Sequence, residues 1–227
     1  MSRDADPMAD FRPDRQIGPL FDRYMLEQDL RQAHPPATFH ASSILACGRQ
    51  QVYGLLGYAP DTSRRRAEWI RDAWVGNYLH DLTLDALRAQ GVLLEREFNL
   101  PENPYRIGGR VDGVVNLGWG PAVLEIKSLA EKYFRALPSH EKALNFRAQV
   151  QLYMHFLRLP TALVLAISRD SQKHAEWRVK YDADYACDLL LRTGQLKRCL
   201  DENIIPAAEP GDGCFFCGYR ETCELEE

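Results

Sequence analysis

The stretch GRVDGVVNLGWGPAVLEIKS, residues 109–128, places two carboxylates and one ammonium group on segments that are otherwise largely apolar. Asp112 lies in the first segment, and Glu125 and Lys127 lie in the second. Strand positions two apart point to one face, so Glu125 and Lys127 face the same way. Ionised groups among apolar residues cost free energy unless something compensates them. A divalent cation would do so, because Mg²⁺ and Mn²⁺ bind carboxylate oxygens, and the ammonium group could then polarise a metal-bound water.

These three side chains also fit a simpler arrangement, a solvated hairpin with ion pairs on its surface. Such pairs are common and contribute little to stability. Asp112, Glu125 and Lys127 do not decide between the two interpretations by themselves.

Three more polar residues lie on helices expected before and after these strands. His80 ends the sequence GNYLH, which begins at Gly76, and its imidazole could bind a metal, while the glycine would let the helix approach a strand. Gln149 and Tyr153 are four residues apart and therefore share one helix face. Taken singly, His80 is equally explained as a packed core histidine, and the other two as an ordinary helix surface.

The order of these residues is more specific than any one of them. Gly-x₃-His, Asp, Glu-x-Lys and Gln-x₃-Tyr follow one another within residues 76–153. This order resembles the PD-(D/E)XK nuclease superfamily, specifically its RecB-like exonuclease branch. One position departs from the pattern, because Val111 precedes the aspartate where the motif has proline, although proline is often absent there in this superfamily. The resemblance implies an α/β fold with a restriction-endonuclease-like core, in which helices flank a mixed central sheet.

The resemblance also implies a role for each residue of the motif. The ligands of a Mg²⁺ or Mn²⁺ ion would be Asp112, Glu125, the main-chain carbonyl of Ile126 and His80, which favours Mn²⁺. The other catalytic residues would be Lys127, which positions the attacking water, and Gln149 and Tyr153, which steady the substrate strand or the lysine.

The chain has six cysteines, and they fall into two groups. Cys187 and Cys199 lie with Leu190, Leu191 and Leu196 on what reads as the apolar side of a helix, so we expect both in the core. The C-terminal stretch GDGCFFCGYRETC contains Cys-x₂-Cys-x₅-Cys and has no fourth cysteine nearby. A four-thiolate site therefore needs a distant partner, and the spacing fits zinc and an iron–sulfur cluster equally well.

One cysteine before the nuclease motifs and three after them is similar to the iron–sulfur nucleases, namely the CRISPR-associated RecB-like exonucleases and the AddB-type nuclease domains. The resemblance implies a [4Fe–4S] cluster, with zinc as the alternative, that joins the C-terminal tail to an N-terminal helix. Its ligands would be Cys47, Cys214, Cys217 and Cys223. Gly48 follows the first of them where these nucleases usually have proline.

Composition limits the class of protein. The 227 residues are 45% hydrophobic and 26% charged, which fits one globular domain. The net charge of −4 argues against indiscriminate binding to polyanions but allows a local basic patch, such as Arg64-Arg65-Arg66. No segment reaches the roughly 20 apolar residues of a membrane span, and the polar N-terminus has no signal-peptide core. We therefore expect a cytoplasmic protein (in the host cytoplasm if phage-encoded) with no membrane partner.

Hydrophobic periodicity and turn residues predict the elements that carry the motif. Helices are expected at about 42–56, 64–90, 139–159 and 183–203, with Ser42 or Ser43 as the first N-cap and Gly57 and Gly91 as stops. Strands are expected at about 92–99, 105–116, 121–128, 161–168 and 176–182. Residues 1–38 should form an N-terminal arm with one short helix. Residues 39–227 should form one nuclease domain, which the tail, residues 205–227, closes through the cysteines.

The motif and the resemblance together favour a Mg²⁺- or Mn²⁺-dependent exonuclease. Its substrate would be DNA, with single strands and the 5′-to-3′ direction favoured, in DNA recombination (including phage recombination), repair or CRISPR adaptation. The alternative is a non-catalytic DNA-binding or adaptor module with a structural metal cluster, and a zinc-stabilised endonuclease is a third interpretation. A recombinase, a helicase or an integrase is a candidate partner, and a homo-oligomer is a candidate assembly.

Overall fold

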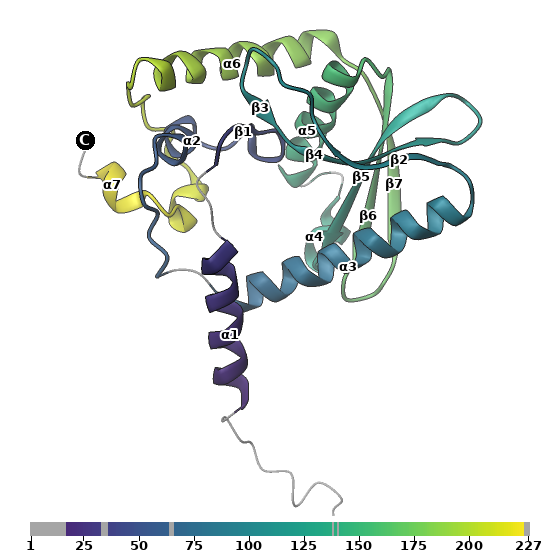
Figure 1. The fold of residues 1–227 in the computed structure, drawn as a ribbon, viewed down its shortest axis with the longest axis horizontal. Helices are drawn as coiled ribbons and strands as arrows, with labels where there is room; N and C mark the ends of the chain where they lie inside the picture. The colour runs from purple at the N-terminus through teal and green to yellow at the C-terminus, as the bar shows by residue number, and fades with distance from the viewer. Residues whose placement is uncertain (1–16, 33–35, 64–65, 138, 140, 225–227) are drawn as a thin grey trace, which may run out of the picture.

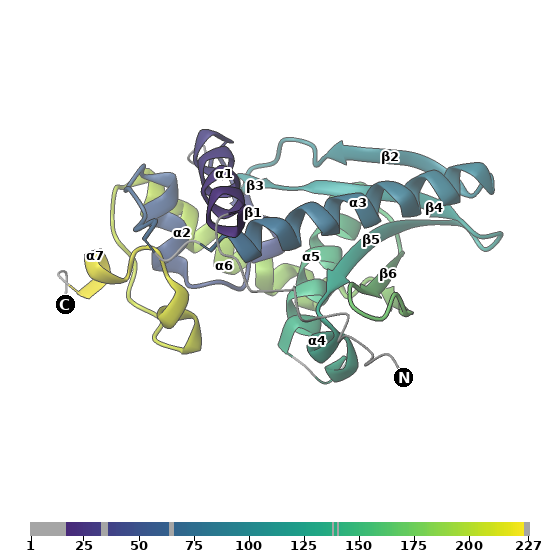
Figure 2. The same ribbon diagram turned by 90° about the horizontal axis from the view of Figure 1, so that it is seen from below.

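A five-stranded mixed sheet forms the centre of the protein (Figures 1 and 2). The computed structural model describes residues 17–32, 36–63, 66–137, 139 and 141–224. The strands are β2 (Leu93–Asn99), β4 (Arg110–Asn116), β5 (Pro121–Leu129), β6 (Thr161–Ser168) and β7 (His174–Lys180). Their order is β2-β4-β5-β6-β7, in which β5 and β6 are parallel and the other neighbours are antiparallel. The expected α/β class with a mixed sheet is therefore confirmed.

The hairpin of β4 and β5 aligns the two acidic strands. Its register pairs Gly113 with Leu124, so the next pair outward brings Asp112 beside Glu125. In the turn, Gly118 has a φ of 89°, a left-handed conformation that glycine adopts without strain. The side-chain oxygen of Asn116 accepts hydrogen bonds from two main-chain N–H groups of this turn, at 3.0 and 3.3 Å. The turn chemistry thus fixes the register that the candidate site requires.

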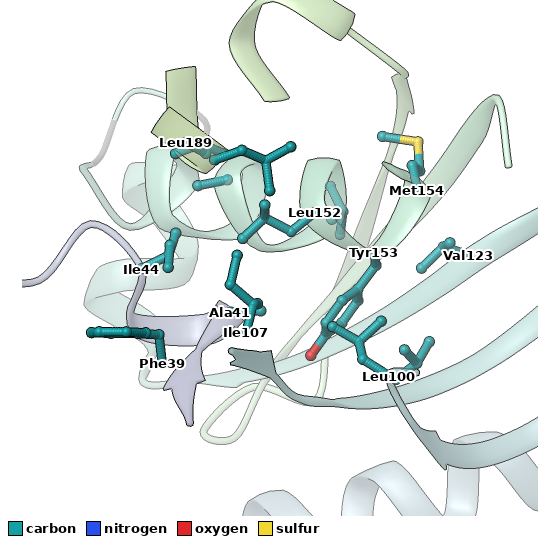
Figure 3. Close-up of a cluster of buried hydrophobic side chains, with 14 of the residues drawn as sticks. Phe39, Ala41, Ile44, Leu100, Ile107, Val123, Leu152, Tyr153, Met154 and Leu189 are labelled. Atoms are coloured by element: carbon teal, nitrogen blue, oxygen red, sulfur yellow. The ribbon is translucent and has the colours of Figure 1, made fainter. Parts of the chain in front are cut away.

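Helices cover both faces of the sheet (Figure 2). They are α3 (Ala67–Ala89) on one face and α5 (Glu141–Leu157) and α6 (Ala183–Asp201) on the other. On the α3 face, Leu84 packs in a small core with Leu124 and Ile126 of β5. The larger core lies on the α5 side, where Tyr153 and Leu189 pack in one cluster with Val123 of β5 (Figure 3). Each buried apolar side chain contributes about 1.5–3 kcal/mol.

The segment before α3 differs from the expected single helix. The structure has a 3₁₀ turn, η1 (Ala41–Ser43), and a later helix, α2 (Gly48–Leu55). The prediction that Ser42 or Ser43 caps a helix reaching residue 56 was therefore wrong. Ala41 and Ile44 are almost fully buried in the large core, and that packing overrides the local capping preference.

Two further elements differ from expectation. The strand expected at 105–116 is interrupted at Gly109, and its first part, β3 (Ile107–Gly108), pairs with β1 (Phe39–His40) as a separate parallel ribbon. A short helix that we did not expect, α4 (Glu131–Ala136), follows β5. In α6, Cys187 is exposed and Cys199 half-buried, so the expectation of a core position was wrong for Cys187.

The two ends of the described chain carry small helices. The expected N-terminal helix is present as α1 (Ile17–Gln32), and the remainder of the arm, residues 1–16 and 33–35, lies outside the described residues. Met25 of α1 is buried, and Asp22 pairs with Arg71 of α3, so this helix is packed against the domain. The C-terminal tail holds η2 (Asp212–Phe216) and α7 (Arg220–Glu224). In the described chain, no helix combines the length and apolar character needed to cross a membrane.

Candidate active site

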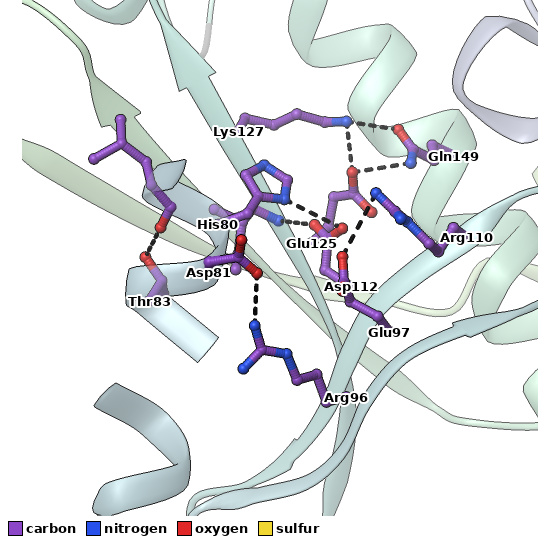
Figure 4. A network of polar contacts seen from close by, with 12 residues as sticks. His80, Asp81, Thr83, Arg96, Glu97, Arg110, Asp112, Glu125, Lys127 and Gln149 are labelled. Atoms are coloured by element: carbon purple, nitrogen blue, oxygen red, sulfur yellow. Dashed lines mark hydrogen bonds and ion pairs between the residues drawn. The ribbon is translucent and has the colours of Figure 1, made fainter. Parts of the chain in front are cut away.

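The motif residues come together where α3 and α5 meet the middle of the sheet (Figure 4). Asp112 comes from β4, Glu125 and Lys127 from β5, and His80 from α3. Gln149 and Tyr153 come from α5. Residues up to 73 positions apart in the chain therefore converge on one polar network, whose centre is buried.

Asp112 is held by the neighbouring strand. One carboxylate oxygen, Oδ2, accepts a hydrogen bond of 2.6 Å from the main-chain N–H of Ile126. The other, Oδ1, lies 3.4 Å from Nδ1 of His80. The Asp112 residue is only 6% exposed, so the orientation of its side chain is set by these two contacts and by packing.

Glu125, which is buried, and Lys127, which is partly exposed, form an ion pair that Gln149 completes. Nζ of Lys127 lies 2.5 Å from Oε1 of Glu125 and donates a hydrogen bond of 2.8 Å to Oε1 of Gln149. The Gln149 amide donates in turn to Oε1 of Glu125, at 2.9 Å. These three contacts close a ring, and such charge-assisted bonds are stronger than neutral ones. Gln149 therefore positions both charged groups of the Glu-x-Lys motif.

Tyr153 anchors the opposite end of this network. Its hydroxyl accepts a hydrogen bond of 3.0 Å from the Gln149 amide and donates one of 3.0 Å to the main-chain carbonyl of Arg110. A side chain at Gly109 would place its Cβ only 2.9 Å from this hydroxyl. The glycine of the GRVD sequence thus leaves room for the tyrosine, which is a role that the sequence analysis did not assign.

Burial or neighbouring charge raises the pKa values of three groups of the network, Glu125, His80 and Tyr153. Burial raises the pKa of Glu125 to about 7; Lys127 opposes this shift, and the negative charge of Asp112 adds to it. For His80, burial lowers the pKa, but the hydrogen bond and charge of Asp112 with the charge of Glu125 outweigh it, so the pKa is raised. Acidic charge therefore raises the pKa of His80, whereas burial raises the pKa of Glu125 against the positive charge of Lys127.

In the part of the chain that the structure describes, one carboxylate oxygen of Glu125 lacks a hydrogen-bond partner that could compensate its charge. Oε2 of Glu125 is buried and finds no hydrogen-bond partner among the residues that the structure describes. A buried carboxylate oxygen without a partner costs free energy that a cation would offset. The donor set also fits, because hard oxygen ligands and one imidazole suit Mg²⁺ or Mn²⁺. Within the described residues, however, no three His, Cys, Asp or Glu side chains already lie close enough to hold one ion.

Two neighbours of the site escaped the sequence analysis. The ring of Phe146 lies 5.1 Å from Nζ of Lys127, close enough for a cation–π contact. Phe146 is three residues before Gln149, and this i, i+3 spacing was the signal that could have found it. Oγ of Ser128 is buried and has no hydrogen-bond partner in the described part of the chain. Gly76 lies next to it, since a Cβ there would come 3.5 Å from Cβ of Ser128, an ordinary contact.

The four cysteines of the second motif line one cavity of about 700 Å³. Cys47 is the N-cap residue of α2, Cys214 lies in η2, Cys217 follows that turn, and Cys223 lies in α7. The structure thus brings Cys47 to the cavity that also holds the three cysteines of the tail. Their side chains do not form a closed set, because no group of three potential ligands in the described ranges surrounds a single ion position.

Polar groups around the cavity point at sulfur atoms. Arg49 donates a hydrogen bond to Sγ of Cys223 at 3.3 Å, and the main-chain N–H of Tyr219 donates one to Sγ of Cys217 at 3.4 Å. Burial raises the pKa of the Cys217 thiol, the Tyr219 N–H lowers it, and the other three cysteines raise it when they are ionised. Four thiolates at one cavity would therefore repel one another unless a cationic centre joined them.

Comparisons with known proteins place the fold. No protein-family model matches the chain, and no curated protein matches it. The crystal structure of SSO0001 is similar with a TM-score of 0.56 at 19% identity, over 94% of this chain and 98% of that one. The structure of LHK-Exo in complex with dAMP is similar with a TM-score of 0.55 at 12% identity, over 83% of this chain and 95% of that one. The structure of an alkaline exonuclease (LHK-Exo) from Laribacter hongkongensis is similar with a TM-score of 0.54 at 11% identity, over 80% of this chain and 93% of that one. The chain is similar to these structures in its fold, and two of the structures are of an exonuclease.

Proposed function

We propose that this protein is a metal-dependent DNA exonuclease. The observation that carries the proposal is the buried network of Asp112, Glu125, Lys127 and Gln149, in which one carboxylate oxygen finds no partner among the described residues. The fold around this network is shared with an alkaline exonuclease, and that enzyme has been crystallised with dAMP, a deoxynucleotide. Both facts favour phosphodiester hydrolysis in DNA.

Asp112 and Glu125 would hold Mg²⁺ or Mn²⁺, with the Ile126 carbonyl and His80 as further ligands. The ion would activate a water and neutralise charge on the phosphoryl oxygens. Asp112 is already oriented by the Ile126 N–H, so it needs no large rearrangement to bind a cation. Because the pKa of Glu125 is raised to about 7, this carboxyl group would release a proton on binding a cation near neutral pH.

Lys127 would act on the attacking water or on the phosphate. An ammonium group has three donors, and two of them are used by Glu125 and Gln149. The third can donate to a water or to an oxygen of the substrate. Because the positive charge is preoriented, it stabilises developing negative charge without reorganisation. Gln149 and Tyr153 keep this lysine and Glu125 in place.

We further propose a [4Fe–4S] cluster, or zinc as the alternative, on Cys47, Cys214, Cys217 and Cys223. The shared cavity and the hydrogen bonds from Arg49 and Tyr219 to two of the sulfur atoms support it. Such a centre would tie the tail to α2 and would be structural, because the cysteines contribute no side chain to the acidic network. A preference for single strands and the 5′-to-3′ direction is part of the proposal through the family resemblance.

End-labelled DNA tests the proposed activity. The cluster-loaded protein, purified without oxygen, is incubated with Mn²⁺ or Mg²⁺ and single strands labelled at either end. We expect mononucleotides or short products from one labelled end, no products in EDTA, and none with Asp112→Asn. Asp85→Asn, an exposed aspartate of α3 that pairs with Arg96, is the matched control and should cleave normally. Tight DNA binding without cleavage by the wild type would instead support the non-catalytic adaptor.

A further inference from the structure

A cluster of exposed aromatic side chains joins the start of α3 to the C-terminal tail. Trp69 is 47% exposed, and Phe215 and Phe216 are each 65% exposed. The rings of Trp69 and Phe216 lie 6.1 Å apart, edge to face, and those of Phe216 and Phe215 lie 4.8 Å apart in the same manner. The guanidinium of Arg66 lies 5.9 Å from the Trp69 ring. We call these four residues the aromatic platform.

The platform shares a helix face with the candidate active site. Trp69 and His80 are 11 residues apart on α3, which is about three full turns, so both side chains leave the helix on the same side. The same spacing places them about 16 Å apart along the helix axis. A strand of stacked nucleotides advances about 3.4 Å per base, so some five nucleotides would span this distance.

The first turns of α3 are fixed relative to the active-site strand. Arg169 pairs with Asp72 of α3 at 2.8 Å and also donates to the main-chain carbonyl of Ser128 on β5, at 3.3 Å. Asp72 is one turn after Trp69. The distance between the platform and the catalytic strand is therefore set by the fold, as a binding subsite requires.

The chemistry of the platform favours nucleic acid over an apolar partner surface. Each exposed ring offers a π face on which a base can stack, whatever the base is. Arg66 is exposed and adds a positive charge at the same place, where it can stack on a base or pair with a phosphate. In the sequence it is the last of three consecutive arginines, in a chain whose net charge is −4.

We propose that the aromatic platform is a base-stacking subsite for single-stranded nucleic acid, which holds the strand about five nucleotides from the phosphate being cleaved. The inference rests on the proposed exonuclease function and adds the place where unpaired bases bind. Because Phe215 and Phe216 lie between Cys214 and Cys217, the cysteine centre would also hold two rings of the platform in position.

The same helix supplies a matched control. Trp74 of α3 is 51% exposed, close to the exposure of Trp69. It is five residues further along, so it leaves the helix about 140° away from Trp69. A general effect of removing an exposed tryptophan from α3 would appear in both variants, whereas a stacking effect would appear in Trp69→Ala alone.

Binding of a labelled oligothymidylate of about 15 nucleotides tests the proposal, in EDTA to prevent cleavage, with fluorescence anisotropy as the readout. We expect Trp69→Ala and Phe216→Ala to raise Kd by roughly 5- to 100-fold. Trp69→Phe should retain most of the affinity, and Trp74→Ala should stay within about twofold of the wild type. An oligomer with abasic sites should bind the wild type as weakly as the thymidylate binds Trp69→Ala.

The salt dependence separates stacking from charge. Trp69→Ala should leave the slope of log Kd against log salt unchanged, whereas Arg66→Ala should reduce it by about one. Unchanged affinity in Trp69→Ala, or equal losses in Trp69→Ala and Trp74→Ala, would overturn the proposal. Normal cleavage by the wild type together with that result would reject the platform alone. Loss of affinity in Trp69→Ala without any cleavage by the wild type would support the platform and reject the exonuclease.

Discussion

The acidic network and the cysteine cavity are organised in opposite ways. Asp112 and Glu125 lie on neighbouring strands, are almost fully buried, and are held by hydrogen bonds from β5 and α5. The four cysteines lie on short helices and turns around a cavity of about 700 Å³, and Cys214 is exposed. The polypeptide alone therefore assembles the first site. The second site would depend on the proposed metal centre, whose binding free energy would become folding free energy.

This contrast predicts that the first site controls rate and the second controls stability. Replacing Lys127 by alanine should give the largest effect, a decrease of about 100- to 1,000-fold in the single-turnover cleavage rate, because a preoriented charge is lost. The circular dichroism spectrum should stay the same. Lys173→Ala, an exposed lysine between β6 and β7, should cleave at the normal rate. Equal rates in the two variants would remove Lys127 from the mechanism.

Replacing Cys217 by serine should have the converse effect. The proposed centre would close a loop from Cys47 to the tail, so its loss should lower the free energy of unfolding by about 2–4 kcal/mol. Iron and acid-labile sulfide, or zinc, should be lost together with that stability, as measured by metal analysis and denaturant unfolding. Cys187→Ser is the control, since Cys187 is exposed on α6 and should change neither quantity. Full metal content in Cys217→Ser would contradict the assignment.

The acidic site should show a pH-dependent stability when metal is absent. Because the pKa of Glu125 is raised to about 7 in the folded protein, the folded state binds a proton there that the unfolded state releases near pH 4.5. The contribution of Glu125 to the free energy of unfolding is largest below about pH 4.5. It falls by roughly 1–3 kcal/mol as the pH rises to about 7. Urea unfolding in EDTA across this range measures it.

Glu125→Gln should remove this part of the pH dependence, since the amide does not titrate and otherwise preserves the shape of the side chain. Saturating Mn²⁺ should shift the profile of the wild type upward at pH values above about 7, where the carboxylate is ionised. An identical pH profile for wild type and Glu125→Gln in EDTA would show that the ionisation of Glu125 does not limit stability.

Replacing Tyr153 by phenylalanine should give the smallest of these effects. The change removes the hydroxyl that joins Gln149 to the Arg110 carbonyl, at a cost of about 1–2 kcal/mol in unfolding free energy. The cleavage rate should fall less than in Lys127→Ala, because Gln149 keeps its contacts with Glu125 and Lys127. Tyr78→Phe, at an exposed tyrosine of α3, should leave both quantities unchanged. A full loss of activity in Tyr153→Phe would give the hydroxyl a direct catalytic role.

The sequence predicted which strands and helices carry the residues of the acidic network, because the signals for these elements are local. Glu125 and Lys127 share a strand face by spacing alone, and the short turn after Asn116 makes β4 the antiparallel neighbour of β5. Gln149 and Tyr153 share a helix face for the same reason. The hydrogen-bond partners, such as the Ile126 N–H for Asp112, required the structure. The neighbours Phe146 and Ser128 required it as well.

Elements whose form depends on tertiary packing were harder to predict. The short helix α4 has no buried residue, so it leaves no periodic apolar pattern. In α6, Leu191 is 61% exposed, and the buried stripe runs through Leu189, Leu190 and Leu196. The sequence predicts that Leu191 is part of the apolar face. Because Cys187 lies four residues before Leu191, it was then expected on that face too. The aromatic platform joins residues more than 140 positions apart and has no local signal at all.

The central claim is that Asp112 and Glu125 hold the catalytic metal in a site that the polypeptide assembles. Titration of Mn²⁺ into metal-free protein at about pH 8, with electron paramagnetic resonance of the free ion, tests it most directly. Saturable binding by the wild type, weakened by at least about tenfold in both Asp112→Asn and Glu125→Gln but not in Asp85→Asn, is the result we predict. Equal Mn²⁺ affinity in all four proteins would contradict it.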